Sequence, residues 1–293
     1  MDRLAAIRAF VTVAERRGFA VAARELRVSA PAVTRMIAAL EEHLTIRLLQ
    51  RTTRSVSVTE AGARYLERAR RILADVDEAE REARAKRVTP AGRFVVTAPT
   101  AFGRLEVAPV VCELLKRFPD VRAELVLADR VVDLVAEGVD LAVRIGVLAD
   151  STLHARAVGS TRRIVVASPA YLARHPIRGP ADLALHAVVQ FTALQQASTE
   201  WTFARDVRVG VKPTLVTNSA EAAIAYALAG NGLAMVLSYQ VRDALAAGTL
   251  VRVLERAEPP ALPIHLVYPA ARLPSATSRA FIDLAKARRW TFP

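Results

Sequence analysis

Two adjacent stretches, Phe19-Ala-Val-Ala-Ala-Arg-Glu-Leu26 and Arg27-Val-Ser-Ala-Pro-Ala-Val-Thr-Arg35, decide how the first part of this chain folds. The first has apolar residues at helical spacing. In the second, Ser29 can cap another helix, and Pro31 is tolerated in the first turn of that helix. Two helices therefore meet across the tight connection Arg27-Val-Ser29, which predicts a helix-turn-helix.

A further helix is predicted before this pair and a β-hairpin after it. The helix has apolar residues at helical spacing from Leu4 to Ala14 and ends at Gly18. The second helix of the pair has an apolar stripe that runs to Leu44. Beyond it, residues 46–50 and 55–58 have strand character and enclose the polar turn Arg51-Thr-Thr-Arg54. The sequence thus predicts a small hairpin with a basic tip.

Residues 59–87 predict one long, charged helix. Its apolar stripe has alternating steps of four and three residues, which is typical of a seam between two helices. The stripe consists of Tyr65, Ala69, Ile72, Val76, Ala79 and Ala83. The alternative is a stripe packed on its own domain. A helix of this length between two domains favours the dimer seam.

The composition changes at Thr89-Pro-Ala-Gly92, which marks a linker. Beyond it, strand-like and helical runs alternate, which predicts an α/β region with largely parallel sheets, large enough for two lobes. The predicted strands are residues 94–97, 123–127, 140–144, 163–167, 232–237 and 263–267, and the predicted helices are residues 105–118, 131–137, 219–229 and 275–288.

The net charge of +12 favours a polyanionic partner, although the excess of arginine equally suits a genome rich in G and C. The single cysteine, Cys112, lies in an apolar run and is expected to be a small buried hydrophobe. Five scattered histidines lack metal-ligand spacing, so no metal site is expected. No uncharged stretch is long enough to span a bilayer, so we expect a cytoplasmic protein without a membrane partner.

The third predicted helix and the hairpin carry the strongest functional signal. The helix has the form of a recognition helix in the major groove, and Arg51 and Arg54 suit phosphates or the minor groove. A solvated polar turn is the alternative for the hairpin tip. The exposed positions expected on the third predicted helix are Ala30, Ala32, Thr34, Arg35 and Ala39.

The whole set of motifs resembles the LysR-type transcriptional regulators. The resemblance rests on the two opening stretches, on Leu40-Glu-Glu-His-Leu44, on Leu48-Leu-Gln-Arg-Thr-Thr-Arg54 and on Val58-Thr-Glu-Ala-Gly62. It implies an α + α/β fold with an N-terminal winged helix-turn-helix, a long linker helix and a C-terminal two-lobed, periplasmic-binding-protein-like α/β effector domain. It also implies that Ser29, Pro31, Thr34 and Arg35 lie at the DNA-facing start of the recognition helix, and that Arg51, Thr52 and Arg54 form the wing.

The resemblance also implies domain limits. These are 1–58 for the DNA-binding domain, 59–88 for the linker and dimerisation helix, and 89–293 for the effector domain. Lobe I then comprises about 92–161 and 268–293, and lobe II about 162–267.

This sequence departs from the family pattern at three positions. Ala30 stands where the family often has a base-contacting Gln, Thr34 replaces a usual Ser, and Thr45 replaces a usual Gly. The first departure removes an expected base contact, so the operator cannot be taken over from relatives.

The resemblance places a small-molecule effector between the two lobes and implies no other cofactor. The implied lining residues are Thr100, Ala101, Phe102, Arg144, Ile145, Gly146, Asn218 and Ser219. Thr100 and Ser219 precede predicted helices, where hydroxyl and N–H groups can hold an anion such as a carboxylate. Alternatively, both are plain helix caps. Arg144 is either a countercharge for the effector or part of a structural ion pair.

The implied partners are double-stranded DNA with an interrupted palindrome and further copies of the chain, as a dimer or a dimer of dimers. RNA polymerase is a further partner that the resemblance allows. One rival, a solute-binding protein of transport, requires a secretory signal, which the charged first ten residues do not provide. The other rival is an enzyme, but no nucleophile-base-acid arrangement is visible.

Overall fold

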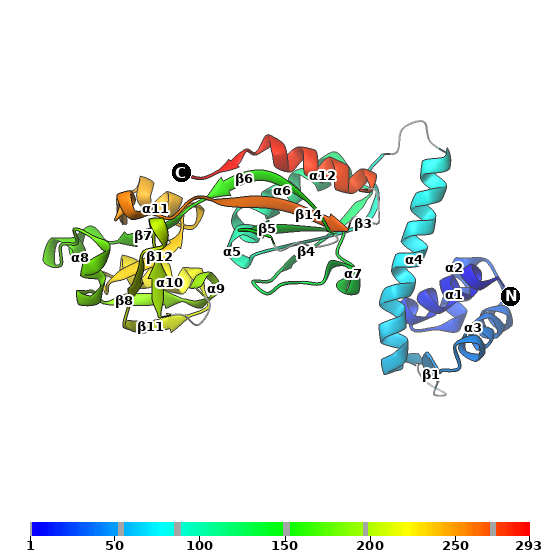
Figure 1. Ribbon diagram of the computed structural model, residues 1–293. Helices are drawn as coiled ribbons and strands as arrows, with labels where there is room; N and C mark the ends of the chain where they lie inside the picture. The colour runs from blue at the N-terminus through cyan, green and yellow to red at the C-terminus, as the bar shows by residue number, and fades with distance from the viewer. Residues whose placement is uncertain (1, 52–55, 85–88, 149–152, 196–198, 270–273) are drawn as a thin grey trace. The chain divides into compact units, whose positions relative to one another are not determined.

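The computed structural model describes residues 2–51, 56–84, 89–148, 153–195, 199–269 and 274–293. The chain divides into two compact units, Met1–Gly92 and Arg93–Pro293 (Figure 1). Among the described residues, no helix is both long enough and apolar enough to cross a membrane.

The first unit contains the predicted three helices, hairpin and long helix. They are α1 (Arg3–Arg16), α2 (Phe19–Leu26), α3 (Ala30–Leu44), β1 (Leu49–Arg51), β2 (Val56–Val58) and α4 (Glu60–Arg84). The Asp2 carboxylate accepts a hydrogen bond from the Ala5 N–H at 3.1 Å and so caps α1. The core of the unit lies between α1, α3 and the hairpin and includes Phe10, Ile37, Leu40 and Leu48.

The end of α3 shows why glycine suits position 45, where this chain has Thr45. Thr45 follows the helix in the left-handed conformation, with a φ of 56°. Glycine adopts this conformation without a steric cost, whereas a β-branched residue does not. The chain therefore holds Thr45 in an unfavourable conformation at the point where it turns toward the hairpin.

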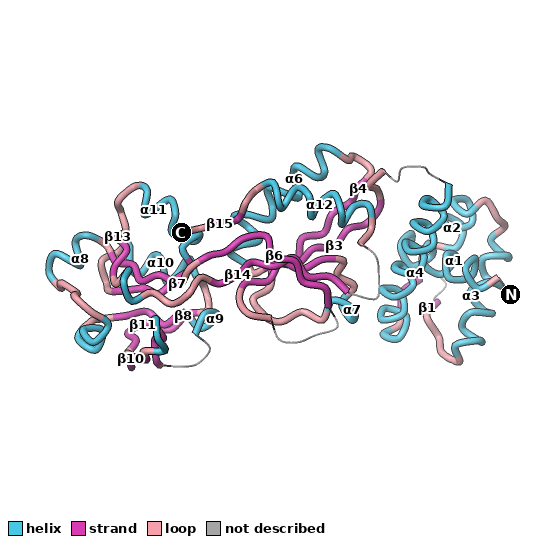
Figure 2. The backbone as a smooth tube through the Cα atoms, turned by 45° about the horizontal axis from the view of Figure 1, so that its top comes forward, coloured by secondary structure: helices cyan, strands magenta, loops and turns pink. Residues whose placement is uncertain are grey.

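Lobe I of the second unit is built around a six-stranded sheet of order β15-β6-β14-β5-β3-β4 (Figure 2). Its elements are β3 (Gly92–Ala98), α5 (Thr100–Phe102), η1 (Gly103–Val107), α6 (Ala108–Arg117), β4 (Val121–Leu127), α7 (Leu134–Glu137), β5 (Leu141–Ile145), β6 (Leu153–Thr161), β14 (Leu262–Pro269), α12 (Ala276–Ala287) and β15 (Trp290–Thr291). Helices α6 and α12 pack against each other (Figure 1).

Lobe II is built around a five-stranded sheet of order β11-β8-β12-β7-β13, with a separate hairpin of β9 and β10. Its elements are β7 (Arg163–Ala167), α8 (Pro169–Arg174), η2 (Pro180–Leu185), β8 (Val188–Phe191), α9 (Thr192–Gln195), β9 (Glu200–Thr202), η3 (Ala204–Asp206), β10 (Arg208–Gly210), β11 (Pro213–Thr217), α10 (Ala220–Leu228), β12 (Leu233–Leu237), η4 (Ser238–Val241), α11 (Arg242–Ala246), β13 (Val251–Val253) and η5 (Glu255–Ala257).

Three expectations for this unit are wrong. The sheets are mixed, not largely parallel, because β14 runs antiparallel to β5 and β6, and β7 runs antiparallel to β12 and β13. Lobe I resumes at β14, which begins at Leu262, so its second segment starts earlier than residue 268. Cys112 is exposed, because the buried side of α6 is formed by Val110, Val111 and Leu114.

Candidate DNA-binding surface and effector cleft

Helix α3 presents its first turns to solvent. Ser29, Pro31 and Arg35 are exposed, while Ala30, Ala32 and Thr34 are half-buried. The opposite side of the helix carries the buried Val33, Ile37 and Leu40. The Ser29 hydroxyl accepts a hydrogen bond from the Ala32 N–H at 3.3 Å, so it also caps α3. This exposed first half leaves Arg35 free of core packing and available to a groove.

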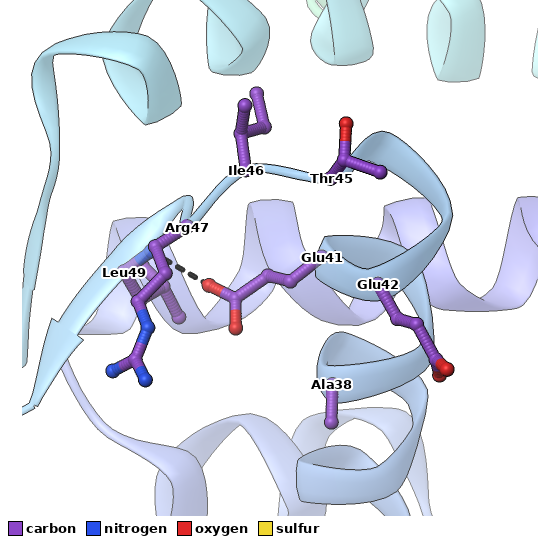
Figure 3. A pocket seen from close by; sticks show the side chains of 7 residues that line it. All are labelled: Ala38, Glu41, Glu42, Thr45, Ile46, Arg47 and Leu49. Carbon is purple, nitrogen blue, oxygen red and sulfur yellow. Dashed lines mark hydrogen bonds between the residues drawn. The ribbon is translucent and has the colours of Figure 1, made fainter.

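The hairpin is fastened to α3 by Glu41, which the sequence reasoning did not single out. Its Oε1 accepts hydrogen bonds from the N–H groups of Leu48 at 2.8 Å and of Leu49 at 3.0 Å. Glu41 lies in a groove together with Thr45, Ile46 and Arg47 (Figure 3). A charged acceptor makes stronger hydrogen bonds than a neutral one. The carboxylate therefore sets the position of the hairpin relative to the recognition helix.

The tip of the hairpin, residues 52–55, lies outside the described residues. Strand β1 ends at Arg51 and β2 begins at Val56. Thr52 and Arg54 lie outside the described residues, and so does the side chain of Arg51. At the base, the Thr59 hydroxyl donates to the Arg47 carbonyl at 2.8 Å.

The stripe of α4 divides between two environments. Ala69 is fully buried in the core of its own unit, and the Tyr65 ring lies 5.7 Å from the Phe10 ring. The assignment of Ala69 to an intermolecular seam is therefore wrong, because no surface of it is left for a partner. Ile72 stays 43% exposed and Val76 is half-buried.

Two ion pairs reinforce the packing of α4 on α1. Arg8 contacts Asp77 at 2.8 Å, and Arg70 contacts Glu15 at 2.9 Å. Each pair joins α1 to α4, and the two helices lie side by side in Figure 1. The side chains of Ala79 and Ala83 lie outside the described residues.

The topology of both lobes creates an edge suited to ligands. In lobe I, β3 and β5 are parallel neighbours, and β4 lies on the other side of β3. In lobe II, β8 lies between β11 and β12 and is parallel to both. In each of these two groups of three strands, the strand that comes first in the chain, β3 or β8, lies between the other two. A topological switch point therefore lies beside β3 in lobe I and beside β8 in lobe II. Ligands of α/β proteins bind beyond the carboxyl ends of strands at such points.

Two of the residues predicted to line the cleft belong to the core. Ala101 is buried and Phe102 is fully buried. The Phe102 ring makes edge contacts with Tyr239 at 5.0 Å and with Trp290 at 5.1 Å. Their assignment as lining residues is wrong, because α5 turns these side chains inward to join the two lobes. Burial also raises the pKa of Tyr239.

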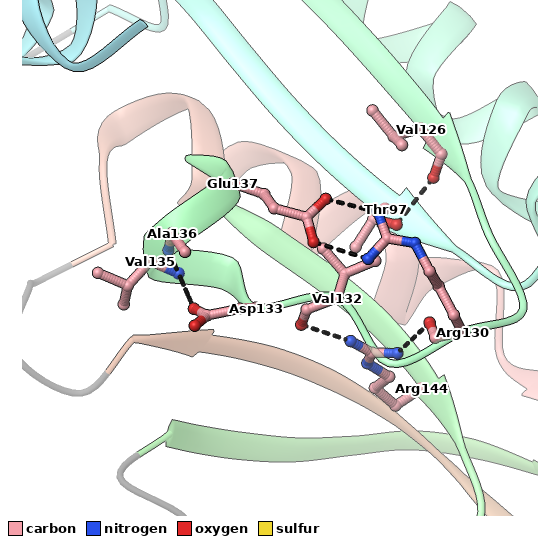
Figure 4. Close-up of polar contacts among 9 residues, drawn as sticks. All are labelled: Thr97, Val126, Arg130, Val132, Asp133, Val135, Ala136, Glu137 and Arg144. Carbon is pink, nitrogen blue, oxygen red and sulfur yellow. Dashed lines mark hydrogen bonds and ion pairs between the residues drawn. The ribbon is translucent and has the colours of Figure 1, made fainter. Parts of the chain in front are cut away.

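Arg144 has a structural role on β5. Its Nη2 donates to the Val132 carbonyl at 2.9 Å and its Nη1 to the Arg130 carbonyl at 3.3 Å (Figure 4). Arg130 in turn pairs with Glu137 at 2.7 Å, and this hydrogen bond holds the pKa of Glu137 below its ordinary value. The predicted countercharge is thus engaged with backbone carbonyls, and the alternative of a structural ion pair is replaced by a structural hydrogen-bond brace.

The remaining predicted residues lie at the strand ends. Thr100 is exposed, and its N–H donates to Asp129 Oδ1 at 3.0 Å. Ile145 and Gly146 are half-buried at the end of β5, and the φ of Gly146 is +114°. Asn218 is exposed between β11 and α10.

Ser219 caps α10. Its hydroxyl accepts from the Ala222 N–H at 3.2 Å and donates to Glu221 Oε2 at 3.1 Å. Both positions predicted to attract an anion are therefore occupied by carboxylates of the chain itself, Asp129 at Thr100 and Glu221 at Ser219. Neither acid carries a sequence signal that would have identified it.

The fold and these surfaces define a class of protein. A winged helix-turn-helix with an exposed recognition helix, followed by a two-lobed α/β domain, is the architecture of a DNA-binding transcription regulator.

Comparisons with known proteins agree. The family described as bacterial regulatory helix-turn-helix protein, lysR family, matches residues 4–63, and the LysR substrate binding domain matches residues 87–290. The regulator PtxR of Pseudomonas aeruginosa is 36% identical over 279 residues, which cover 94% of this chain and 89% of PtxR. The regulator CrgA of Neisseria meningitidis serogroup B is 34% identical over 278 residues, which cover 94% of this chain and 93% of CrgA.

Solved structures show the same full-length architecture. The structure of CrgA, a LysR-type transcriptional regulator from Neisseria meningitidis, is similar with a TM-score of 0.63 and 31% identity, and the likeness covers 98% of both chains. The chain belongs to the family of LysR-type transcriptional regulators. Its relatives are regulators of transcription and not enzymes.

Proposed function

We propose that this LysR-type regulator binds an interrupted palindrome in double-stranded DNA and responds to a small anionic effector in the cleft of its second unit. The observation that carries the DNA-binding part is the exposed first half of α3 beside a hairpin fastened by Glu41. An exposed Arg35 on a rigid helix suits a guanine edge, and the hairpin tip suits phosphates. The proposed site of action is the cytoplasm.

The proposed assembly is a dimer or a dimer of dimers, because a palindrome requires two recognition helices. The exposed Ile72 on α4 is the apolar residue that this assembly would cover. RNA polymerase is the proposed further partner of the DNA-bound form.

Selection from a pool of randomised duplexes tests the DNA-binding part. The wild-type chain should enrich an inverted repeat. Arg35→Ala should change the enriched sequence, since base contacts carry specificity. Arg51→Ala should weaken binding to every sequence and lower the logarithmic salt slope by about one unit. Lys116→Ala, an exposed cation on α6, serves as the control. Equal loss of specific and random DNA binding in Arg35→Ala would contradict a base-reading role.

The anionic class of the effector is supported by the two internal carboxylates. Asp129 on the Thr100 N–H and Glu221 on the Ser219 hydroxyl occupy positions that favour negative charge. An organic acid that replaces one of them would stabilise the folded chain by mass action, by about 2.7 kcal/mol at a hundred times its dissociation constant.

A thermal-shift screen of organic acids tests this part. An acid that stabilises the wild type should stabilise a Thr100→Val, Ser219→Ala double variant less. Equal stabilisation of both proteins would show that neither hydroxyl contacts the acid. If no organic acid stabilises the wild type, the anionic class loses its support.

A further inference from the structure

One helical turn of lobe I, η1, forms ion pairs with lobe II. Helices α5, η1 and α6 follow one another without a break, and η1 is a π-helix in which the Ala108 N–H donates to the Gly103 carbonyl. Pro109 gives a cause for this irregularity. It has no N–H to offer the Leu105 carbonyl, and its ring would clash with that carbonyl in a regular α-helix. Single π turns occur frequently at functional sites.

The π turn carries two residues that reach lobe II. Arg104 Nη2 contacts Glu221 Oε1 at 2.9 Å, at the start of α10. Glu106 Oε1 contacts Arg242 Nη1 at 3.2 Å, at the start of α11. We call these two ion pairs the crossed pairs, because lobe I contributes the cation of one and the anion of the other.

The crossed pairs flank the aromatic contacts between the lobes. Phe102, which directly precedes the π turn, contacts Tyr239 of lobe II at 5.0 Å. The guanidinium of Arg242 lies 5.9 Å from the centre of the Phe292 ring, which also holds it in place. Glu106 is the least exposed member, with 12% of its side chain accessible. Burial raises its pKa, and Arg242 opposes that shift.

We propose that the crossed pairs form an electrostatic latch that holds the effector cleft closed in the absence of effector. Opening of the cleft separates the π turn from the starts of α10 and α11 and so breaks both pairs. The regulatory meaning of the latch rests on the proposed function, since the cleft is the proposed effector site. The latch itself is testable without any ligand.

The test measures the distance between the lobes in the full-length chain. Spin labels are attached at Asp120→Cys in lobe I and Ala181→Cys in lobe II, both exposed positions, in a Cys112→Ser background. Labelled chain is mixed with excess unlabelled chain, so that only distances within one chain are read. With all four charges of the crossed pairs present, the chain should give a short distance between the two labels at 0.05 M sodium chloride. It should give a longer one at 1 M, where the screening length is about 3 Å.

Variants identify the groups responsible. Arg104→Gln and Arg242→Gln should each lower the ratio of closed to open chains by about twofold to fivefold, the range for partly exposed ion pairs. The reversal Arg104→Glu with Glu221→Arg should restore the wild-type distance. Arg117→Gln is the matched control, because Arg117 is as exposed as Arg104 but pairs with Glu113 inside lobe I.

The double variant Arg104→Gln, Arg242→Gln removes the cations of both crossed pairs and should open the cleft further than either single variant. Distances that are insensitive to salt and to the double variant, or that shift equally in Arg117→Gln, would overturn the latch. Such a result would leave operator selection and the acid screen unaffected, so failure of the latch and failure of the proposed function are distinguishable.

Discussion

Removal of the Glu41 carboxylate is expected to loosen the hairpin from the recognition helix. Glu41 accepts two backbone hydrogen bonds, from Leu48 at 2.8 Å and from Leu49 at 3.0 Å. The side chains of both leucines are buried in the core of the unit. Loss of a charged acceptor costs about 1.5–3 kcal/mol for each bond. Water can enter the groove of Figure 3 and replace part of the lost hydrogen bonding. We therefore expect Glu41→Ala to lower the stability of the hairpin contact by about 2–4 kcal/mol.

Hydrogen exchange at the two leucine amides measures this effect. A loss of about 2 kcal/mol corresponds to exchange roughly thirty times faster. Glu41→Gln keeps a neutral acceptor and should lose about half as much free energy. Glu42→Ala is the matched control, because Glu42 is the exposed neighbour on the same helix. If the amides of Leu48 and Leu49 exchange at the wild-type rate in Glu41→Ala, the carboxylate does not hold the hairpin.

Three further predictions follow from single residues. Ile72→Lys places an ammonium on the exposed part of the α4 stripe and should dissociate the proposed dimer; an unchanged sedimentation coefficient would show that Ile72 is not covered by a partner. Thr45→Gly relieves the left-handed conformation and should raise stability by about 1 kcal/mol in urea denaturation; no gain would mean that Thr45 is not strained. Burial, with the nearby His175, lowers the pKa of His186. The folded chain then binds fewer protons than the unfolded chain, so stability should fall as the pH drops below about 6.5, and thermal melting should show a smaller fall in His186→Gln.

Local features of the chain were predictable from the sequence because they depend on neighbouring residues. The caps of α3 and α10, at Ser29 and Ser219, follow from a hydroxyl placed before an apolar helical run. The predicted strands that are almost entirely apolar, such as β7 and β12, lie where expected because both of their faces are buried beyond Arg163 at the start of β7. Strand β6 was not predicted, since only one of its nine residues is buried and its side chains are largely small or charged.

The recognition helix and the order of the domains were therefore determined by the sequence alone, since helix caps, apolar periodicity and family motifs all act over short distances. The lining of the proposed effector cleft was not determined by the sequence alone. Only the tertiary structure decided that Phe102 points into the core and that Arg144 braces the backbone. It also brought Arg104 to Glu221 across 117 positions and Glu106 to Arg242 across 136. Pairings of this kind depend on where the chain crosses between lobes, and no local pattern of charge records that path.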